Sequence, residues 1–145
     1  MRTIALLVAL LWAVPALAVS PVNRSLIGGV AIKGYDAVAY FLQGQPVKGS
    51  KAFAFAWNDA TWHFSSAEHR DLFARDPAAY APQFGGYCAW AVSQGYTANI
   101  DPASWKIVSG KLYLNYDPGV QARWAQDIPG FIAQAEKNWP GLLAK

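Results

Sequence analysis

The side chains best suited to catalysis or metal binding are those of two histidines, His63 and His69, and of the single cysteine of the chain, Cys88. Thiolate and imidazole groups are ligands for soft metals, and an imidazole that contacts a thiol can also activate it as a nucleophile. The sequence therefore offers His69 and Cys88 as a metal-binding pair or as a redox or thiol-transfer pair, provided that the fold brings them together. Each also has a purely structural interpretation: His69 as a hydrogen-bonded helix histidine, and Cys88 as a small buried hydrophobic residue.

His69 is positioned by an expected helix over residues 66–75. Ser65 and Glu68 have the spacing of a capping box, in which each side chain bonds the other residue's backbone N–H. Asp76-Pro77 ends the helix, because the residue before a proline avoids helical backbone angles. By contrast, His63 alternates with large apolar neighbours, so we expect it on the water-facing side of a strand.

Cys88 follows the double glycine Gly85-Gly86, which predicts a sharp bend or a close approach of two backbone segments. The residues at 87–92 are almost all apolar. This composition predicts that Cys88 is buried.

The remaining segments predict a small α+β domain. Residues 53–57 alternate in size and 62–64 in polarity, and Asn58-Asp59 between them is a turn signal, so 53–57 and 61–64 read as a hairpin. Residues 105–108 and 111–114 on either side of Ser109-Gly110 read as a second hairpin. Residues 37–41 read as a further strand and 93–104 as a surface loop. Asp117 and Asp127 each precede a helix. The expected fold class is thus α+β: a single small domain of short antiparallel β-hairpins packed on a central helix, with a C-terminal helical pair.

Six tryptophans lie after position 18. We interpret these rings mainly as core, because they lie in alternating strand patterns, and an aromatic cleft for a sugar or another flat ligand is the alternative. The tryptophans are Trp57, Trp62, Trp90, Trp105, Trp124 and Trp139.

The N-terminus has the pattern of a secretory signal peptide over residues 1–18: Arg2, an apolar run that is too short to span a bilayer, and the small-x-small site Ala16-Leu17-Ala18. We expect a periplasmic or secreted protein, without a membrane anchor after cleavage. Residues 19–33 read as a mobile mature N-terminus and 34–140 as the domain.

Composition and charge argue against a disordered protein and against a nucleic-acid-binding protein. Hydrophobic residues make up 54% of the chain and charged residues 14%, which is too apolar for a disordered protein. The net charge is +3 and the basic residues are scattered, so we expect no nucleic-acid partner.

Several motifs resemble the YHS domain, a module with the pattern F-C-S-x-x-C-x-x-x-F-x-x-[DN]-P-x-x-Y. The chain is also similar to small exported YHS-domain proteins in four further segments. The matching residues are Phe64-Ser65-Ser66, Phe73, Asp76-Pro77 and Tyr80, with the segments 34–41, 85–89, 110–116 and 127–131. The resemblance covers nearly all of residues 30–140.

What the resemblance implies is an exported accessory or binding domain that is more a binding module than an enzyme. Related modules hold soft metals such as copper or zinc through cysteines, and those positions fall here on Ala39, Ser65 and His69. Only His69, with Cys88 from another segment, would supply donors, so we expect weak metal binding at most. A cysteine-dependent redox or thiol enzyme and a structural or protein-interaction module remain as alternatives.

Overall fold

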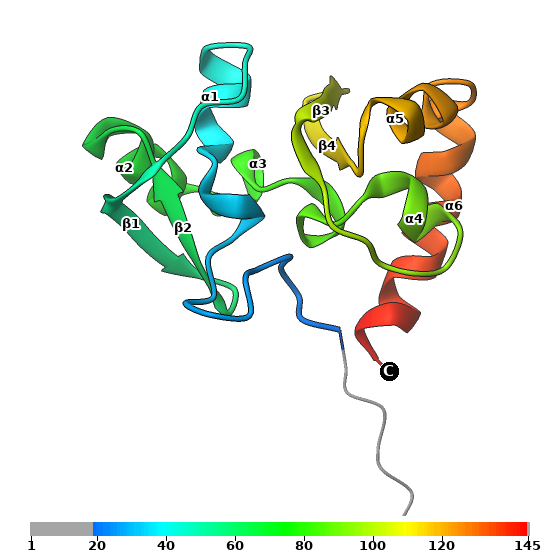
Figure 1. The fold of residues 1–145 in the computed structure, drawn as a ribbon, viewed down its shortest axis with the longest axis horizontal. Coiled ribbons are helices and arrows are strands. Elements are labelled where there is room, and N and C mark those ends of the chain that lie inside the picture. The colour runs from blue at the N-terminus through cyan, green and yellow to red at the C-terminus, as the bar shows by residue number, and fades with distance from the viewer. Residues whose placement is uncertain (1–18, 145) are drawn as a thin grey trace, which may run out of the picture.

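The computed structural model describes residues 19–144, so the signal-peptide prediction lies outside the described residues. The described chain has an α+β fold, as the sequence predicts. It consists of helices and two separate antiparallel hairpins (Figure 1). The elements in chain order are a 3₁₀ turn η1 (Ile32–Gly34), α1 (Ala37–Leu42), β1 (Ser50–Trp57), β2 (Ala60–Phe64), α2 (Ala67–Arg75), α3 (Pro77–Tyr80), a 3₁₀ turn η2 (Gln83–Gly86), α4 (Ala89–Ser93), β3 (Asp101–Val108), β4 (Lys111–Asn115), α5 (Pro118–Trp124) and α6 (Ile128–Leu143).

Both predicted hairpins are confirmed. β1 pairs with β2 through a turn in which Asn58 and Asp59 both have positive φ. β3 pairs with β4 through a turn in which Ser109 and Gly110 both have positive φ. Two consecutive residues with positive φ define the turn that best fits the twist of paired strands. The second hairpin begins at Asp101, so the expected loop over 93–104 is wrong in its last residues.

The expected strand over residues 37–41 is wrong, because this segment is helix α1. An apolar run of this length does not distinguish a strand from a buried helix. Asp36 decides the outcome: its side chain accepts hydrogen bonds from the backbone N–H groups of Val38 and Ala39. These bonds satisfy donors that a helix start leaves free.

The central helix α2 confirms the predicted range, but its cap is one residue later than the sequence suggested. Ser66 is the N-cap, and its hydroxyl accepts from the N–H of His69. Glu68 is exposed in the first turn, and the Ser65–Glu68 capping box does not form. Asp76 ends the helix and Pro77 opens α3, as expected.

The core has two parts, and strand β4 contributes to both. Leu112 and Leu114 join one cluster, with Trp62, Phe64 and others, whereas Tyr113 joins a second cluster with Trp124. Successive strand residues point to opposite faces, so β4 is buried on both sides.

Helices α5 and α6 form the predicted C-terminal pair, and each is capped by an aspartate, Asp117 and Asp127. Figure 1 shows α5 and α6 on the side of the molecule opposite to β1 and β2. Within residues 19–144, none of the helices combines the length and apolar character needed to cross a bilayer.

The segment 19–33 packs on the domain, which corrects the expectation of a mobile N-terminus. Val22 and Ile32 are each only 1% exposed. The N–H of Asn23 donates to the carbonyl of Gly85, and the N–H of Ala31 donates to that of Thr61. Apolar side chains at both ends of the segment thus hold it in the core.

Candidate functional site

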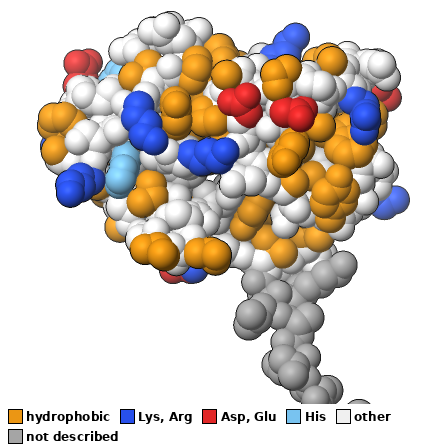
Figure 2. Space-filling view, in the orientation of Figure 1, with side chains coloured by type: hydrophobic (Ala, Val, Ile, Leu, Met, Phe, Trp, Pro, Cys, Tyr) orange, Lys and Arg blue, Asp and Glu red, His pale blue; other side chains and the backbone are white. Residues whose placement is uncertain are grey.

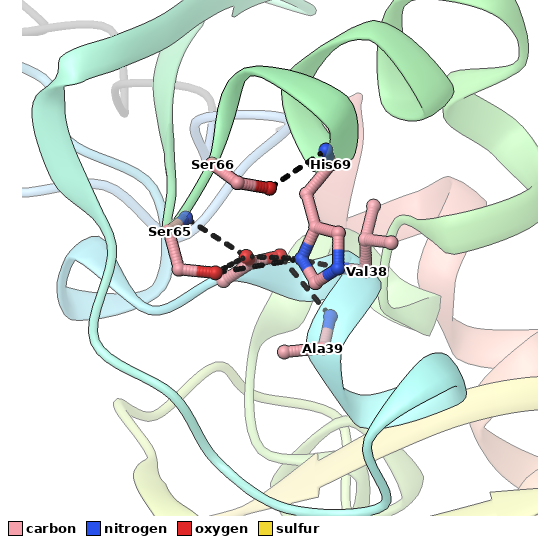
Figure 3. Close-up of polar contacts among 6 residues, drawn as sticks. Val38, Ala39, Ser65, Ser66 and His69 are labelled. Carbon is pink, nitrogen blue, oxygen red and sulfur yellow. Dashed lines mark hydrogen bonds and ion pairs between the residues drawn. The ribbon is translucent and has the colours of Figure 1, made fainter.

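A buried polar cluster is centred on the carboxylate of Asp36, which is fully buried. One oxygen, Oδ1, accepts from the N–H groups of Val38 and Ala39. The other, Oδ2, accepts from the N–H of Ser65 at 2.9 Å and from its hydroxyl at 2.6 Å, and lies 2.6 Å from His69 Nδ1. Figure 3 shows Ser65 and His69 on opposite sides of the point where these bonds converge, with Val38 and Ala39 of α1 on the side of His69.

Hydrogen-bond donors surround the buried Asp36 carboxylate. A buried carboxylate is costly unless hydrogen-bond donors surround it, and Asp36 has five. The donors come from α1, from the end of β2 and from α2. Asp36 therefore ties three elements together at one point.

Two of the positions at which the YHS resemblance places metal-binding cysteines, Ser65 and His69, donate to Asp36 through their side chains, and Ala39 does so through its backbone. Asp36 is not among the site residues predicted from the sequence. An aspartate before an apolar run is an N-cap signal, and reading residues 37–41 as a strand concealed it.

The cluster contains serine, histidine and aspartate but lacks the arrangement of a hydrolase. In a catalytic triad the serine and the aspartate contact opposite nitrogens of the imidazole. Here both approach Nδ1: Ser65 Oγ lies 3.5 Å from it, and the serine hydroxyl bonds the aspartate at shorter distance. The serine proton is thus held by the carboxylate and not by a base that would remove it.

Cys88 lies in a different polar network. It precedes α4, is 1% exposed, and its thiol donates to Asn115 Oδ1 at 3.5 Å. The same oxygen accepts from the N–H of Trp90, and the Asn115 amide donates to Gln121. The hydrogen bonds of His69 and those of Cys88 share no residue, so the structure does not join the predicted pair.

Burial raises the pKa of the Cys88 thiol above its ordinary value. Nearby backbone groups of Ala91, Tyr116 and Trp90 offset only part of this rise, and Asp117 adds to it. A reactive cysteine needs a lowered pKa that favours the thiolate. The environment of Cys88 therefore keeps the thiol protonated and weakly nucleophilic.

The thiol forms part of a pocket of about 250 Å³. Its wall is mostly aromatic and aliphatic, and Arg123 stacks over the Trp90 ring, with its guanidinium carbon 5.0 Å from the ring centroid. The lining residues are Cys88, Trp90, Ala91, Tyr96, Ala98, Tyr116 and Val120. Hydrophobic side chains gather on the half of the molecule that holds α4, α5 and the second hairpin, whereas Lys and Arg are scattered (Figure 2).

The donor set does not fit a copper or zinc site. Among residues 19–144, no three His, Cys, Asp or Glu side chains come together as metal ligands. His69 uses Nδ1 on Asp36, and Cys88 is bonded to Asn115. The double glycine that predicts a sharp bend, Gly85-Gly86, lies in η2, and both residues have positive φ.

Comparison with protein-family models, with curated proteins and with solved structures finds no match for this chain. The resemblance to YHS domains therefore stays a prediction from the motifs.

Proposed function

We propose that the protein is an exported, non-enzymatic binding domain of the YHS type, which takes a small, largely apolar ligand into the Cys88 pocket. The observation that carries the proposal is the position of the only thiol of the chain in a pocket with three aromatic rings, Trp90, Tyr96 and Tyr116. Pockets of this kind, mainly apolar with one or two polar groups, are typical of small-molecule sites.

Two features support binding over catalysis. The thiol has a raised pKa, and its hydrogen-bond partner is the amide oxygen of Asn115, which is not a base. The only buried histidine, His69, is held by Asp36. A thiol enzyme would need a base that contacts the sulfur.

The test uses indole as a small apolar probe and follows the backbone NMR signals of the protein. We expect the signals of Trp90, Ala98 and Val120 to shift together, and bound indole to slow alkylation of Cys88. Val120→Trp should fill the pocket and abolish both effects. If indole shifts none of these signals, or shifts them equally in Val120→Trp, the pocket is not a ligand site.

Metal handling is tested separately, because one thiol leaves most coordination positions of copper or zinc without protein donors. We expect the purified protein to retain less than one metal per chain after dialysis. Stoichiometric metal that is lost in Cys88→Ser would contradict the proposal and restore a metal function.

A further inference from the structure

A second pocket, of about 230 Å³, lies where the β1–β2 turn, the segment after residue 19 and the C-terminal end of α6 approach one another. Figure 1 shows these three parts along one edge of the molecule. Three indole rings line the pocket, together with Asn58 and small apolar residues. The full lining is Pro21, Val22, Trp57, Asn58, Trp62, Ala81, Pro82, Gly85, Trp139 and Leu143.

Aromatic packing holds the three rings in place. Trp62 is 1% exposed and donates its indole N–H to the carbonyl of Trp57 at 3.1 Å. Trp57 packs edge-on against Phe73, with centroids 5.7 Å apart. Trp139, in α6, packs against aromatic neighbours with centroids about 6 Å away. The pocket is thus preformed, so a ligand would not have to order these side chains on binding.

The pocket also offers free hydrogen-bonding groups and no charge. The indole N–H groups of Trp57 and Trp139 and the amide of Asn58 have no partner within residues 19–144 and are not sealed from solvent. Asn58 supplies both donors and an acceptor. No lining residue is charged. A charged ligand would lose its hydration here without a compensating partner.

We propose that this pocket binds a neutral sugar ring. A pyranose presents flat C–H faces that stack on indole rings and hydroxyls around its edge that bond N–H and amide groups. A flat aromatic ligand would use the rings alone, whereas a sugar would also bond the Asn58 amide and the indole N–H groups. The pocket has room for one sugar unit, so affinity for a monosaccharide should be in the range of about 1 mM. The site is distinct from the Cys88 pocket and shares no lining residue with it.

The test titrates the protein, labelled with ¹⁵N, with glucose, N-acetylglucosamine and cellobiose, and with indole as the aromatic comparison. We expect a sugar to shift the indole N–H signals of Trp57 and Trp139 and not that of Trp105, which packs on Tyr40 outside the pocket. Trp139→Ala should weaken binding at least ten-fold. Trp139→Phe and Asn58→Asp, which keep the packing and the turn, should each weaken it several-fold.

Trp105→Phe is the matched control and should bind the sugar as wild type does. Trp90→Phe, in the Cys88 pocket, should also leave sugar binding unchanged, so failure of one site is distinguishable from failure of the other. The proposal is overturned if no sugar shifts the two signals up to ~50 mM, well above the expected dissociation constant. It is also overturned if indole shifts the Trp57 and Trp139 signals and no sugar does, or if Trp139→Phe and Asn58→Asp bind sugar as wild type does.

Discussion

The carboxylate of Asp36 lies 2.6 Å from the imidazole Nδ1 of His69, although the two residues are 33 positions apart in the chain. The Ser65 hydroxyl reaches the same oxygen. His69, which the sequence suggests as a metal ligand or a base, is therefore part of a buried hydrogen-bonded cluster. The consequence is that the candidate ligand positions of the YHS resemblance stabilise the fold in this chain.

Asp36→Ala should destabilise the domain by about 3–5 kcal/mol, because it leaves five donors without their acceptor and removes the cap of α1. Ser65→Ala should cost about 1–2 kcal/mol in wild type and much less in Asp36→Ala. Urea unfolding of the two single variants and the double variant measures this coupling. The exposed Lys51→Ala serves as control, with a change within ~0.5 kcal/mol. Additive losses would show that Ser65 and Asp36 do not act together.

Ser66→Ala should cost about 1 kcal/mol, because the Ser66 hydroxyl caps α2. Glu68→Ala should change stability by no more than ~0.5 kcal/mol, since Glu68 is exposed and makes no capping bond. Thermal or urea unfolding compares the two. A larger loss for Glu68→Ala than for Ser66→Ala would instead support the capping box that the sequence suggests.

Gly85→Ala should be much more costly than Gly44→Ala, although both glycines have a φ of +64°. A Cβ at Gly85 would collide with the backbone carbonyl of Pro21, whereas a Cβ at Gly44 meets nothing within 4 Å. We expect about 1–2 kcal/mol for Gly44→Ala, from the backbone angle alone, and several kcal/mol for Gly85→Ala. Equal losses, measured by urea unfolding, would mean that the N-terminal segment does not pack on η2.

Gly86→Val tests the neighbouring position. A Cβ at Gly86 would lie 2.5 Å from Ile32 Cγ2 and 3.0 Å from Pro82 Cγ, at a φ of +81°. Both contacts are too close, so we expect a loss of stability and a shift of Ile32 in the core. Unchanged stability of Gly86→Val in the same urea assay would remove the argument for close packing at this turn.

Alkylation of Cys88 in the folded protein should follow a pKa above the usual value of about 8.5 for a thiol. Because the folded state holds this proton more tightly than the unfolded state, the stability due to the neutral thiol is complete below the unfolded pKa. It falls as the pH rises through that value toward the folded pKa. Cys88→Ala should lose this part of the alkaline dependence of unfolding. A wild-type alkylation profile centred below 8 would identify a reactive thiolate instead, at odds with that pKa.

Local sequence signals determined most of the secondary structure. The turns at Asn58-Asp59 and Ser109-Gly110, the helix start at Asp117 and the stop at Asp76-Pro77 all depend on residues within a few positions of one another, and all appear in the structure. Alternation of residues identified β1 and β2 for the same reason, since it reflects a strand's own geometry.

Tertiary structure decided the site. Whether Ala37–Leu42 became helix or strand depended on the acceptor at Asp36, and the role of Ser65 depended on a carboxylate 29 residues away. Long-range packing likewise separated the bonding partners of Cys88 and His69 and brought Trp57 and Trp139 to one pocket. A buried polar group must find its partners wherever the folded chain brings them, and spacing in the sequence does not encode that choice.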